Sequence, residues 1–351
     1  MPRATSLFDL TRQELAERVT QMGERPYRAG QIFSWVYQKQ ERTFDSMTNL
    51  STPFREALAQ NLSISPPQVV GQKASGDGTR KLLLRLEDRE HVESVLIPMR
   101  GHHTLCISSQ TGCRGGCRIC LTAKRGPGRN LHAREIVGQV AACQDTLEPG
   151  QRITNVVFMG MGEPLDNLEN VLKAVRILYD DHGYRFSSRR VTVSTCGLIP
   201  GIKRLGSEEE VSLAVSLNAA DDETRSRLMP VNRKHPLGEL IEALRQYPMR
   251  RRRRITFEYV LLKGVNDSPG DADALSVLLR GIRAKVNLIA FNPFPGAGFE
   301  RPSPGDVLAF QDRLRERGVS AMVRQSKGSD ILAACGQLAG VKRNHEGRLH
   351  G

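Results

Sequence analysis

The stretch Thr104–Gly126, TLCISSQTGCRGGCRICLTAKRG, places three of the chain's seven cysteines within eight residues. Cys113, Cys117 and Cys120 follow an apolar run, Thr104–Ser109, that predicts a β-strand. The spacing CxxxCxxC is typical of a loop that offers three thiolates to one cubane iron–sulfur cluster. The glycines between the cysteines let the backbone fold closely around such a cluster. The loop therefore predicts a [4Fe–4S] site at the end of a strand.

Three thiolates leave one iron of a cubane open. In enzymes that use this kind of loop, the open iron binds the amino and carboxylate groups of S-adenosylmethionine (SAM). The alternative is structural zinc, which needs four closed tetrahedral ligands. No second CxxC or His pair lies nearby, and His102 and His103 precede the strand without a known finger spacing. We therefore favour the cluster over zinc.

Strand-like and helical stretches alternate from about residue 103 onward, which predicts a parallel sheet with helices outside it. Six strands are expected, which also fits an open, partial α/β barrel with its chemistry at the carboxyl ends of the strands. The expected strands are Thr104–Ser109, Ile153–Met159, Val191–Thr195, Val211–Leu217, Ile255–Val260 and Val286–Ala290. The clearest helices between them are Ala133–Gln144, Asn167–Tyr179 and Asp271–Arg280.

The chain before this core divides into two parts. Residues 1–65 predict a compact helical accessory domain, in which Thr11 and Glu14 are placed as a capping box and Arg28–Tyr37 carries apolar residues at helical spacing. Short strands are expected at Gln68–Gln72, Lys81–Leu86 and His91–Ile97. The expected organisation is a helical domain at 1–65, a β-hairpin connector at 66–100, a core at 101–340 and a basic tail at 341–351.

The formal net charge of +13 favours a polyanionic partner such as nucleic acid. The densest basic run, Arg250–Arg254, is a candidate phosphate contact together with Lys124, Arg125 and Arg129, although a solvated surface is the plain alternative. No uninterrupted apolar stretch approaches the 18 or so residues of a membrane span. Clustered thiols and the lack of a secretory signal pattern predict a cytoplasmic protein.

Further motifs fall at the ends of the expected strands. In Met159–Pro164, MGMGEP, the glycines permit close backbone approach, and Glu163 can accept hydrogen bonds from a ligand amine. Ser194 and the segment Ser216-Leu217-Asn218 are placed to meet the ribose or carboxylate of SAM, with ordinary strand-end capping as the alternative.

Taken with NPFPG at Asn292–Gly296 and AACGQLAG at Ala333–Gly340, these residues resemble the RlmN/Cfr family of radical-SAM RNA adenine methyltransferases. The segments Tyr27–Trp35 and Phe44–Ser51 extend the resemblance to nearly the whole chain. The resemblance implies an α/β fold, a partial (βα)6 TIM-like radical-SAM barrel with a small helical RNA-binding domain and a short β-hairpin connector. It also implies a [4Fe–4S] cluster and SAM as cofactors.

The resemblance carries over site residues by position. It places the cluster on Cys113, Cys117 and Cys120. The implied SAM contacts are Gly162, Glu163, Ser194, Ser216, Leu217, Asn218 and Asn292. Asn218 stands where the family frequently has histidine, and Cys196 where it commonly has serine, so the role of Cys196 stays open.

The resemblance also implies a two-SAM reaction. One SAM methylates Cys335, and a second yields a 5′-deoxyadenosyl radical that takes hydrogen from the S-methyl group. The methylene radical then adds to the adenine. Cys106 resolves the adduct by forming a disulfide with Cys335, and Glu93 matches the family's proton acceptor. From sequence alone, Cys106 and Glu93 would be a core cysteine and an exposed carboxylate, and Cys143 is expected to be structural.

The implied substrate is C2 of adenosine 2503 in 23S ribosomal RNA, together with adenosine 37 of transfer RNA. The expected partners are these RNAs and an electron donor such as flavodoxin or ferredoxin, with the chain as a monomer. Three alternatives stay open. One is a Cfr-like enzyme that methylates C8, and another is a radical-SAM enzyme with a non-RNA substrate. The third is a non-catalytic RNA-binding protein with structural zinc.

Overall fold

A ten-stranded sheet organises the computed structural model, which describes residues 4–250, 252–340, 342–343 and 349–350. Its order is β12-β11-β10-β9-β8-β7-β6-β5-β4-β3. Neighbours from β6 to β12 run parallel, and those from β3 to β6 run antiparallel. The strands are β3 Gln68–Ala74, β4 Arg80–Arg85, β5 His91–Met99, β6 His102–Cys106, β7 Ile153–Phe158, β8 Val191–Thr195, β9 Ser212–Ser216, β10 Ile255–Leu261, β11 Ala284–Ala290 and β12 Ala321–Val323.

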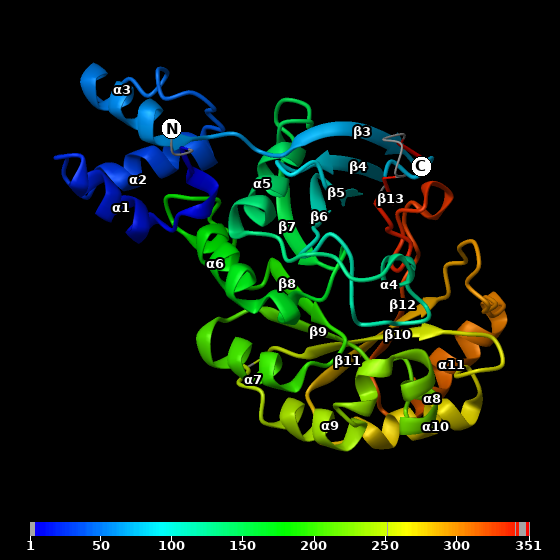
Figure 1. Ribbon diagram of the computed structural model, residues 1–351. Helices are drawn as coiled ribbons and strands as arrows, with labels where there is room; N and C mark the ends of the chain where they lie inside the picture. The colour runs from blue at the N-terminus through cyan, green and yellow to red at the C-terminus, as the bar shows by residue number, and fades with distance from the viewer. Residues whose placement is uncertain (1–3, 251, 341, 344–348, 351) are drawn as a thin grey trace.

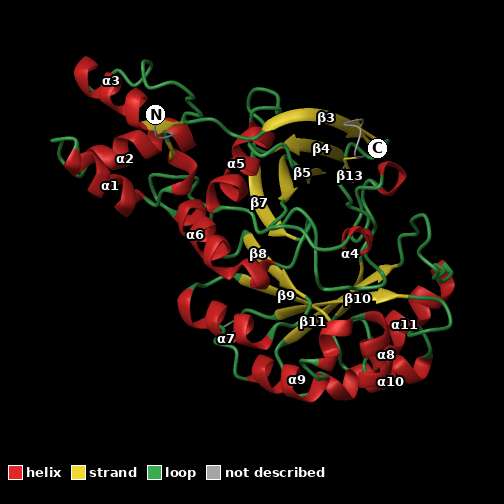
Figure 2. Ribbon diagram, viewed as in Figure 1, coloured by secondary structure: helices red, strands yellow, loops and turns green. Residues whose placement is uncertain are grey.

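Helices alternate with the parallel strands and cover the outer face of the curved sheet (Figures 1 and 2). They are α5 Ala133–Gln144, α6 Leu168–Tyr179, α7 Ile199–Glu208, α8 Asp222–Leu228, α9 Leu237–Arg245, α10 Pro269–Leu278 and α11 Pro304–Glu316. The short α4, Leu121–Arg125, follows the cysteine loop directly. The predicted open α/β barrel is thus confirmed.

Two features of the sheet differ from expectation. β12 is an unpredicted parallel edge strand, because its three residues are too short for a periodicity signal. The connector strands β3–β5 extend the main sheet instead of standing apart, since β5 pairs with β6 from Val95↔Cys106 to Met99↔His102. The connector is therefore built into the same sheet as the barrel.

The N-terminal domain contains α1 Arg12–Gln21, α2 Arg28–Phe33 with a π-helical continuation to Gln38, and α3 Thr52–Asn61. The expected capping box of Thr11 and Glu14 is present. Pro53 lies in the first turn of α3, where proline is favoured, and does not break a helix. A short parallel pair, β1 Thr5–Ser6 with β2 Leu62–Ser63, joins the two ends of the domain. Of the expected basic tail, the structure describes only the pair β13 Lys342–Arg343 and β14 Leu349–His350; the rest lies outside the described residues.

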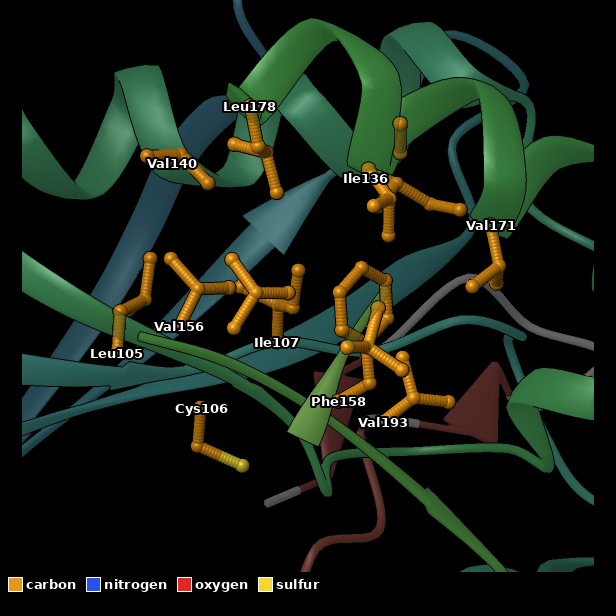
Figure 3. Packing of buried hydrophobic residues seen from close by; sticks show 14 of the residues in the cluster. Leu105, Cys106, Ile107, Ile136, Val140, Val156, Phe158, Val171, Leu178 and Val193 are labelled. Atoms are coloured by element: carbon orange, nitrogen blue, oxygen red, sulfur yellow. The ribbon is translucent and has the colours of Figure 1, made fainter. Parts of the chain in front are cut away.

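Strand alternation separates the hydrophobic core from the barrel interior (Figure 3). Leu105 and Ile107 point toward the helices α5 and α6, where they meet residues such as Val140 and Leu178. Cys106, between them, points to the opposite side of the sheet. This is the consequence of the two-residue period of a strand, and it turns Cys106 toward the inside of the barrel. Among the described residues, no helix is long and apolar enough to cross a membrane.

Candidate active site

The carboxyl ends of the parallel strands surround a cavity of about 180 Å³. Most residues singled out from the sequence line it, although they come from segments that are far apart along the chain. The lining includes Cys113, Cys117, Cys120, Gly162, Glu163, Ser194, Ser216, Asn218, Asn292 and Cys335. The barrel therefore brings the cysteine loop, the strand-end motifs and the AACGQLAG segment to one place.

The three loop cysteines are free thiols that share this cavity. The backbone around Gly115 forms a cradle: a Cβ built there would lie 3.3 Å from Cys113 Sγ and 3.9 Å from Cys117 Sγ. Among the described residues, no three His, Cys, Asp or Glu side chains converge closely enough to hold a single metal ion. Three cysteine side chains on one glycine-rich loop match the donor set of a cubane cluster, whereas structural zinc takes four closed tetrahedral ligands.

The MGMGEP turn leaves β7 and lies against the start of the cysteine loop. Gly162 has φ +102°, and a Cβ there would lie 2.6 Å from the Gln110 side chain, so only glycine fits. Glu163 is buried and accepts hydrogen bonds from Leu165 N at 3.0 Å and from Cys196 N at 2.8 Å. Burial raises the pKa of Glu163, while these hydrogen bonds oppose the increase. The carboxyl group is thus held rigidly at the cavity wall.

The remaining strand-end residues differ in how they meet the cavity. Ser194 and Ser216 line it from β8 and β9. Asn218 adopts φ +60°, and its side chain accepts a hydrogen bond from Val260 N at 2.9 Å. Leu217, which was also predicted to contact SAM, is fully buried, and its side chain does not line the cavity. Its carbonyl accepts a hydrogen bond from Arg225.

Cys335 lines the cavity from a segment that packs against the cysteine loop; the residue as a whole is exposed, but protein atoms surround its thiol. The contact is close, because Leu121 N donates to Gly336 O at 2.7 Å. Asn292 Nδ2 donates to Cys335 O at 3.4 Å. Desolvation raises the pKa of the Cys335 thiol to about 11, with a smaller contribution from the Glu258 carboxylate. The tertiary structure thus joins the NPFPG and AACGQLAG motifs at the cysteine loop.

Cys106 is the last residue of β6; it is buried and points to the side of the sheet opposite Leu105 and Ile107 (Figure 3). Burial raises the pKa of its thiol, and Cys335 is close enough to add to the effect by electrostatic repulsion. Both thiols are free in this structure. The geometry brings together two cysteines that are far apart in the sequence, which composition alone would have assigned to a core and a loop.

Glu93 does not line the cavity, and it is buried, contrary to the plain expectation of an exposed strand carboxylate. Its Oε1 forms an ion pair with Lys81 Nζ at 3.1 Å. Its Oε2 accepts hydrogen bonds from Ala339 N at 2.9 Å and Gly340 N at 3.1 Å. In this conformation Glu93 therefore holds the end of the Cys335 segment.

Sequence reasoning missed two charged residues at the site. Glu258 lines the cavity from β10, where alternate residues face the interior, and it accepts a hydrogen bond from Asn287 Nδ2 at 2.8 Å. A carboxylate in the apolar run ITFEYVL was the available signal. Arg225 is fully buried and donates to Cys196 O and Asn232 Oδ1, both at 2.7 Å. No feature of the sequence indicated that Arg225 is buried, because an arginine on a short polar helix is normally expected to be exposed.

The candidate phosphate contacts separate into different environments. Arg129 pairs with Glu135 at 2.8 Å and with Asp88 at 2.5 Å, and Arg125 donates to Ala339 O. These two arginines therefore serve the protein's own structure. Cys143 is buried in α5, as expected for a structural cysteine.

Two family descriptions match the chain. Residues 5–64 match the ribosomal RNA large subunit methyltransferase N-terminal domain, and residues 107–274 match the radical SAM superfamily. A crystal structure of a radical SAM methyltransferase from Sphaerobacter thermophilus superposes with a TM-score of 0.90 at 48% identity, covering 95% of this chain and 99% of that one. The fold and the cysteine loop thus define a radical-SAM enzyme, whose superfamily implies a [4Fe–4S] cluster and SAM.

Curated relatives identify the family more narrowly. A protein of Syntrophus aciditrophicus named dual-specificity RNA methyltransferase RlmN is 49% identical over 95% of this chain and 96% of its own length. A protein of the same name from Desulfosudis oleivorans is 51% identical over 94% of this chain and 90% of its own length. The chain belongs to the RlmN family.

Proposed function

We propose that this protein methylates C2 of adenosine 2503 in 23S ribosomal RNA and of adenosine 37 in transfer RNA, through an S-methylated Cys335. The observation that carries the proposal is the placement of Cys335 at the cavity shared by Cys113, Cys117 and Cys120. The relatives' printed name, dual-specificity RNA methyltransferase, supports RNA as the substrate class.

The residues of the chain divide the work between holding and reacting. Cys113, Cys117 and Cys120 would hold the cluster, and Glu163 with the strand-end residues would orient SAM. Bound together, the cluster and SAM supply the radical chemistry that an electron-poor adenine carbon requires. Cys335 accepts the methyl group as a thiolate and carries it to the base.

Cys106 and Glu93 would complete the cycle. The Cys106 thiolate would attack the sulfur of Cys335, so that an S–S bond forms as the C–S bond to the RNA breaks; the electron pair stays on the methylene carbon, which takes up a proton to become the methyl group of the product. The burial of Cys106 and its proximity to Cys335 support this role. Glu93, as proton acceptor, would have to exchange its contacts with Ala339 and Gly340 for the substrate. Movement of the Cys335 segment during the cycle would permit that exchange.

The cleft between the N-terminal helices and α6 is a candidate surface for the RNA stem. It has a volume of about 1410 Å³ and combines basic and aromatic side chains, as sites that track a nucleic-acid backbone do. Its lining includes Tyr27, Trp35 and Lys39, together with three cations that are held in ion pairs: Arg12 with Asp180, Lys173 with Glu14, and Arg176 with Glu208 and Glu209. The match of residues 5–64 to a ribosomal RNA methyltransferase domain supports the assignment.

The decisive experiment is an anaerobic assay of the reconstituted protein with methyl-labelled SAM, a 23S RNA fragment and transfer RNA, followed by nucleoside mass spectrometry. We expect 2-methyladenosine from the wild type and none from Cys335→Ala. Cys106→Ala should leave RNA covalently attached to Cys335, and Cys143→Ala is the matched control that keeps activity. The product 8-methyladenosine would instead establish the C8 alternative, and unmodified RNA despite SAM cleavage would remove RNA as the substrate.

We also propose a cytoplasmic monomer that receives electrons from a flavodoxin or ferredoxin. The formal net charge of +13 supports such a donor, because a basic protein surface attracts an acidic electron carrier. To test the donor, reduction of the reconstituted cluster by each carrier is monitored by absorbance. Sedimentation of the protein tests whether it is a monomer.

A further inference from the structure

A second basic groove lies at the end of the barrel opposite the cavity. It has a volume of about 860 Å³, and its walls are formed by the segments that lead into β8, β9, β10 and β11. Arg189 precedes β8, Arg254 immediately precedes β10, and Lys285 is the second residue of β11. The basic residues that line the groove are Arg189, Arg250, Arg252, Arg253, Arg254 and Lys285.

The groove is well separated from the reacting residues. Cavity residues such as Glu258 and Val260 lie toward the carboxyl end of β10, whereas Arg254 lies before its amino end. At about 3.3 Å per residue, Arg254 and Val260 are about 20 Å apart along the strand. Of the run predicted as a phosphate contact, Arg250 and Arg252–Arg254 therefore lie too far from the cavity to touch the phosphates of the target nucleotide, and Arg251 lies outside the described residues.

The acidic residues in the groove neutralise only part of its charge. Glu208 and Glu209 pair with Arg176, which lies outside the groove. Glu210 pairs with Arg250 at 2.8 Å and with Arg253 at 3.0 Å. These contacts fix two of the arginines as a scaffold.

The other four cations that line the groove are Arg189, Arg252, Arg254 and Lys285. Arg189, Arg252 and Arg254 are exposed, and no ion pair is recorded for them or for Lys285 among the described residues. Guanidinium groups near the amino ends of the strands match the geometry of phosphate oxygens, which each group can bind through two hydrogen bonds. A surface with this excess of positive charge attracts a polyanion by Coulomb forces and counterion release.

We propose that this groove is an RNA exosite that binds the phosphodiester backbone of a segment remote from the methylated adenosine. The inference rests on the proposed RNA substrate and specifies how a large RNA is engaged. A substrate of several helices can reach around the barrel to both ends, whereas a single stem-loop seated at the cavity cannot. The exosite therefore strengthens the binding of long ribosomal RNA and does not affect the binding of a minimal stem-loop.

The test compares two RNAs that contain the target adenosine, a multi-helix 23S fragment and the isolated stem-loop. Binding is titrated at several salt concentrations, and methylation is measured in the same samples. The test variant is Arg252→Gln/Arg254→Gln. The matched control, Lys203→Gln/Arg315→Gln, removes the same charge from exposed positions on α7 and α11. Thermal melting verifies that both variants fold.

With the long fragment, the test variant should bind more weakly and lower the slope of log K against log salt by about 1.4 to 1.8, the value for two lost phosphate contacts. The stem-loop should bind and react as with the wild type, and the control variant should leave both RNAs unaffected. Unchanged binding of the long fragment overturns the exosite and leaves an acidic protein as the groove's partner. Equal weakening of both RNAs also overturns it. If the wild type binds but methylates neither RNA, the proposed function fails independently of this result.

Discussion

Lys81 and Glu93 form a buried ion pair of 3.1 Å on the neighbouring strands β4 and β5, and together they hold both ends of the segment that carries Cys335. Lys81 Nζ also donates to Leu332 O at 3.0 Å, and Glu93 accepts from Gly340 N. The β-hairpin region, expected as a simple connector, thus positions Cys335 relative to the cysteine loop.

Replacing Lys81 tests this arrangement. In Lys81→Met, Glu93 keeps its charge without its partner, and removing one member of a buried pair costs about 3–5 kcal/mol. We expect that loss in the free energy of unfolding, measured by urea denaturation, together with slower methylation of Cys335. Lys73→Met, at an exposed position on β3, is the matched control and should change neither quantity. The double variant Lys81→Met/Glu93→Gln should recover most of the stability; equal stability of wild type and Lys81→Met would refute the role of the pair.

Gly162→Ala should distort the MGMGEP turn, which we propose contacts SAM. The substitution forces a left-handed φ on alanine and places its Cβ 2.6 Å from Gln110, so the turn has to move. We expect SAM affinity, measured by equilibrium dialysis on the reconstituted protein, to fall at least about ten-fold, because backbone strain of this kind costs about 1–3 kcal/mol and about 1.4 kcal/mol corresponds to ten-fold in affinity. Gly238→Ala, whose added Cβ meets nothing within 4 Å, should bind SAM normally. Retained affinity in Gly162→Ala would show that the turn does not contact SAM.

The Cys335 thiol should react slowly at neutral pH. Since its pKa is raised to about 11, the reactive thiolate is scarce at pH 7, and the rate of alkylation by iodoacetamide should rise about ten-fold per pH unit up to that value. Glu258→Gln removes a repelling negative charge, so the pKa should fall and alkylation at pH 8 should become faster. Mass spectrometry of the Cys335 peptide measures both rates, with buried Cys143 as the unreactive reference. A rate that is independent of pH, or equal in the two proteins, contradicts this description.

Arg225 should prove structurally essential although it is not among the residues that line the cavity. It donates to Cys196 O at the end of β8 and to Leu217 O after β9, so it ties two strand ends of the cavity together. Arg225→Met leaves these buried acceptors unsatisfied, at about 1–3 kcal/mol each. We expect a loss of about 3 kcal/mol or more in denaturant unfolding. Arg227→Met, an exposed neighbour on α8, should be nearly neutral.

Much of the barrel could be predicted because its signals are local. Val191–Thr195 and Ala133–Gln144 have the predicted bounds, since apolar periodicity and end residues act within a few residues of the chain. The position of Arg254 could have been derived as well, although it was not predicted: Arg254 immediately precedes an expected strand and therefore lies at the amino end of the barrel. β12 and the attachment of β3–β5 to the main sheet were not predictable, because strand pairing depends on partners far away in sequence.

The sequence by itself determined the chemistry that this protein can perform, because CxxxCxxC and MGMGEP are short motifs whose spacing suffices for a cluster loop and a ligand turn. Only the tertiary structure decided how the residues from distant segments meet. Closing the sheet brings Cys335 to the cysteine loop, places Cys106 behind it and turns Glu258 inward. It also buries Lys81 and Glu93 as the clamp of the Cys335 segment. Such contacts arise from packing between distant segments, and packing leaves no mark in the local pattern of residues.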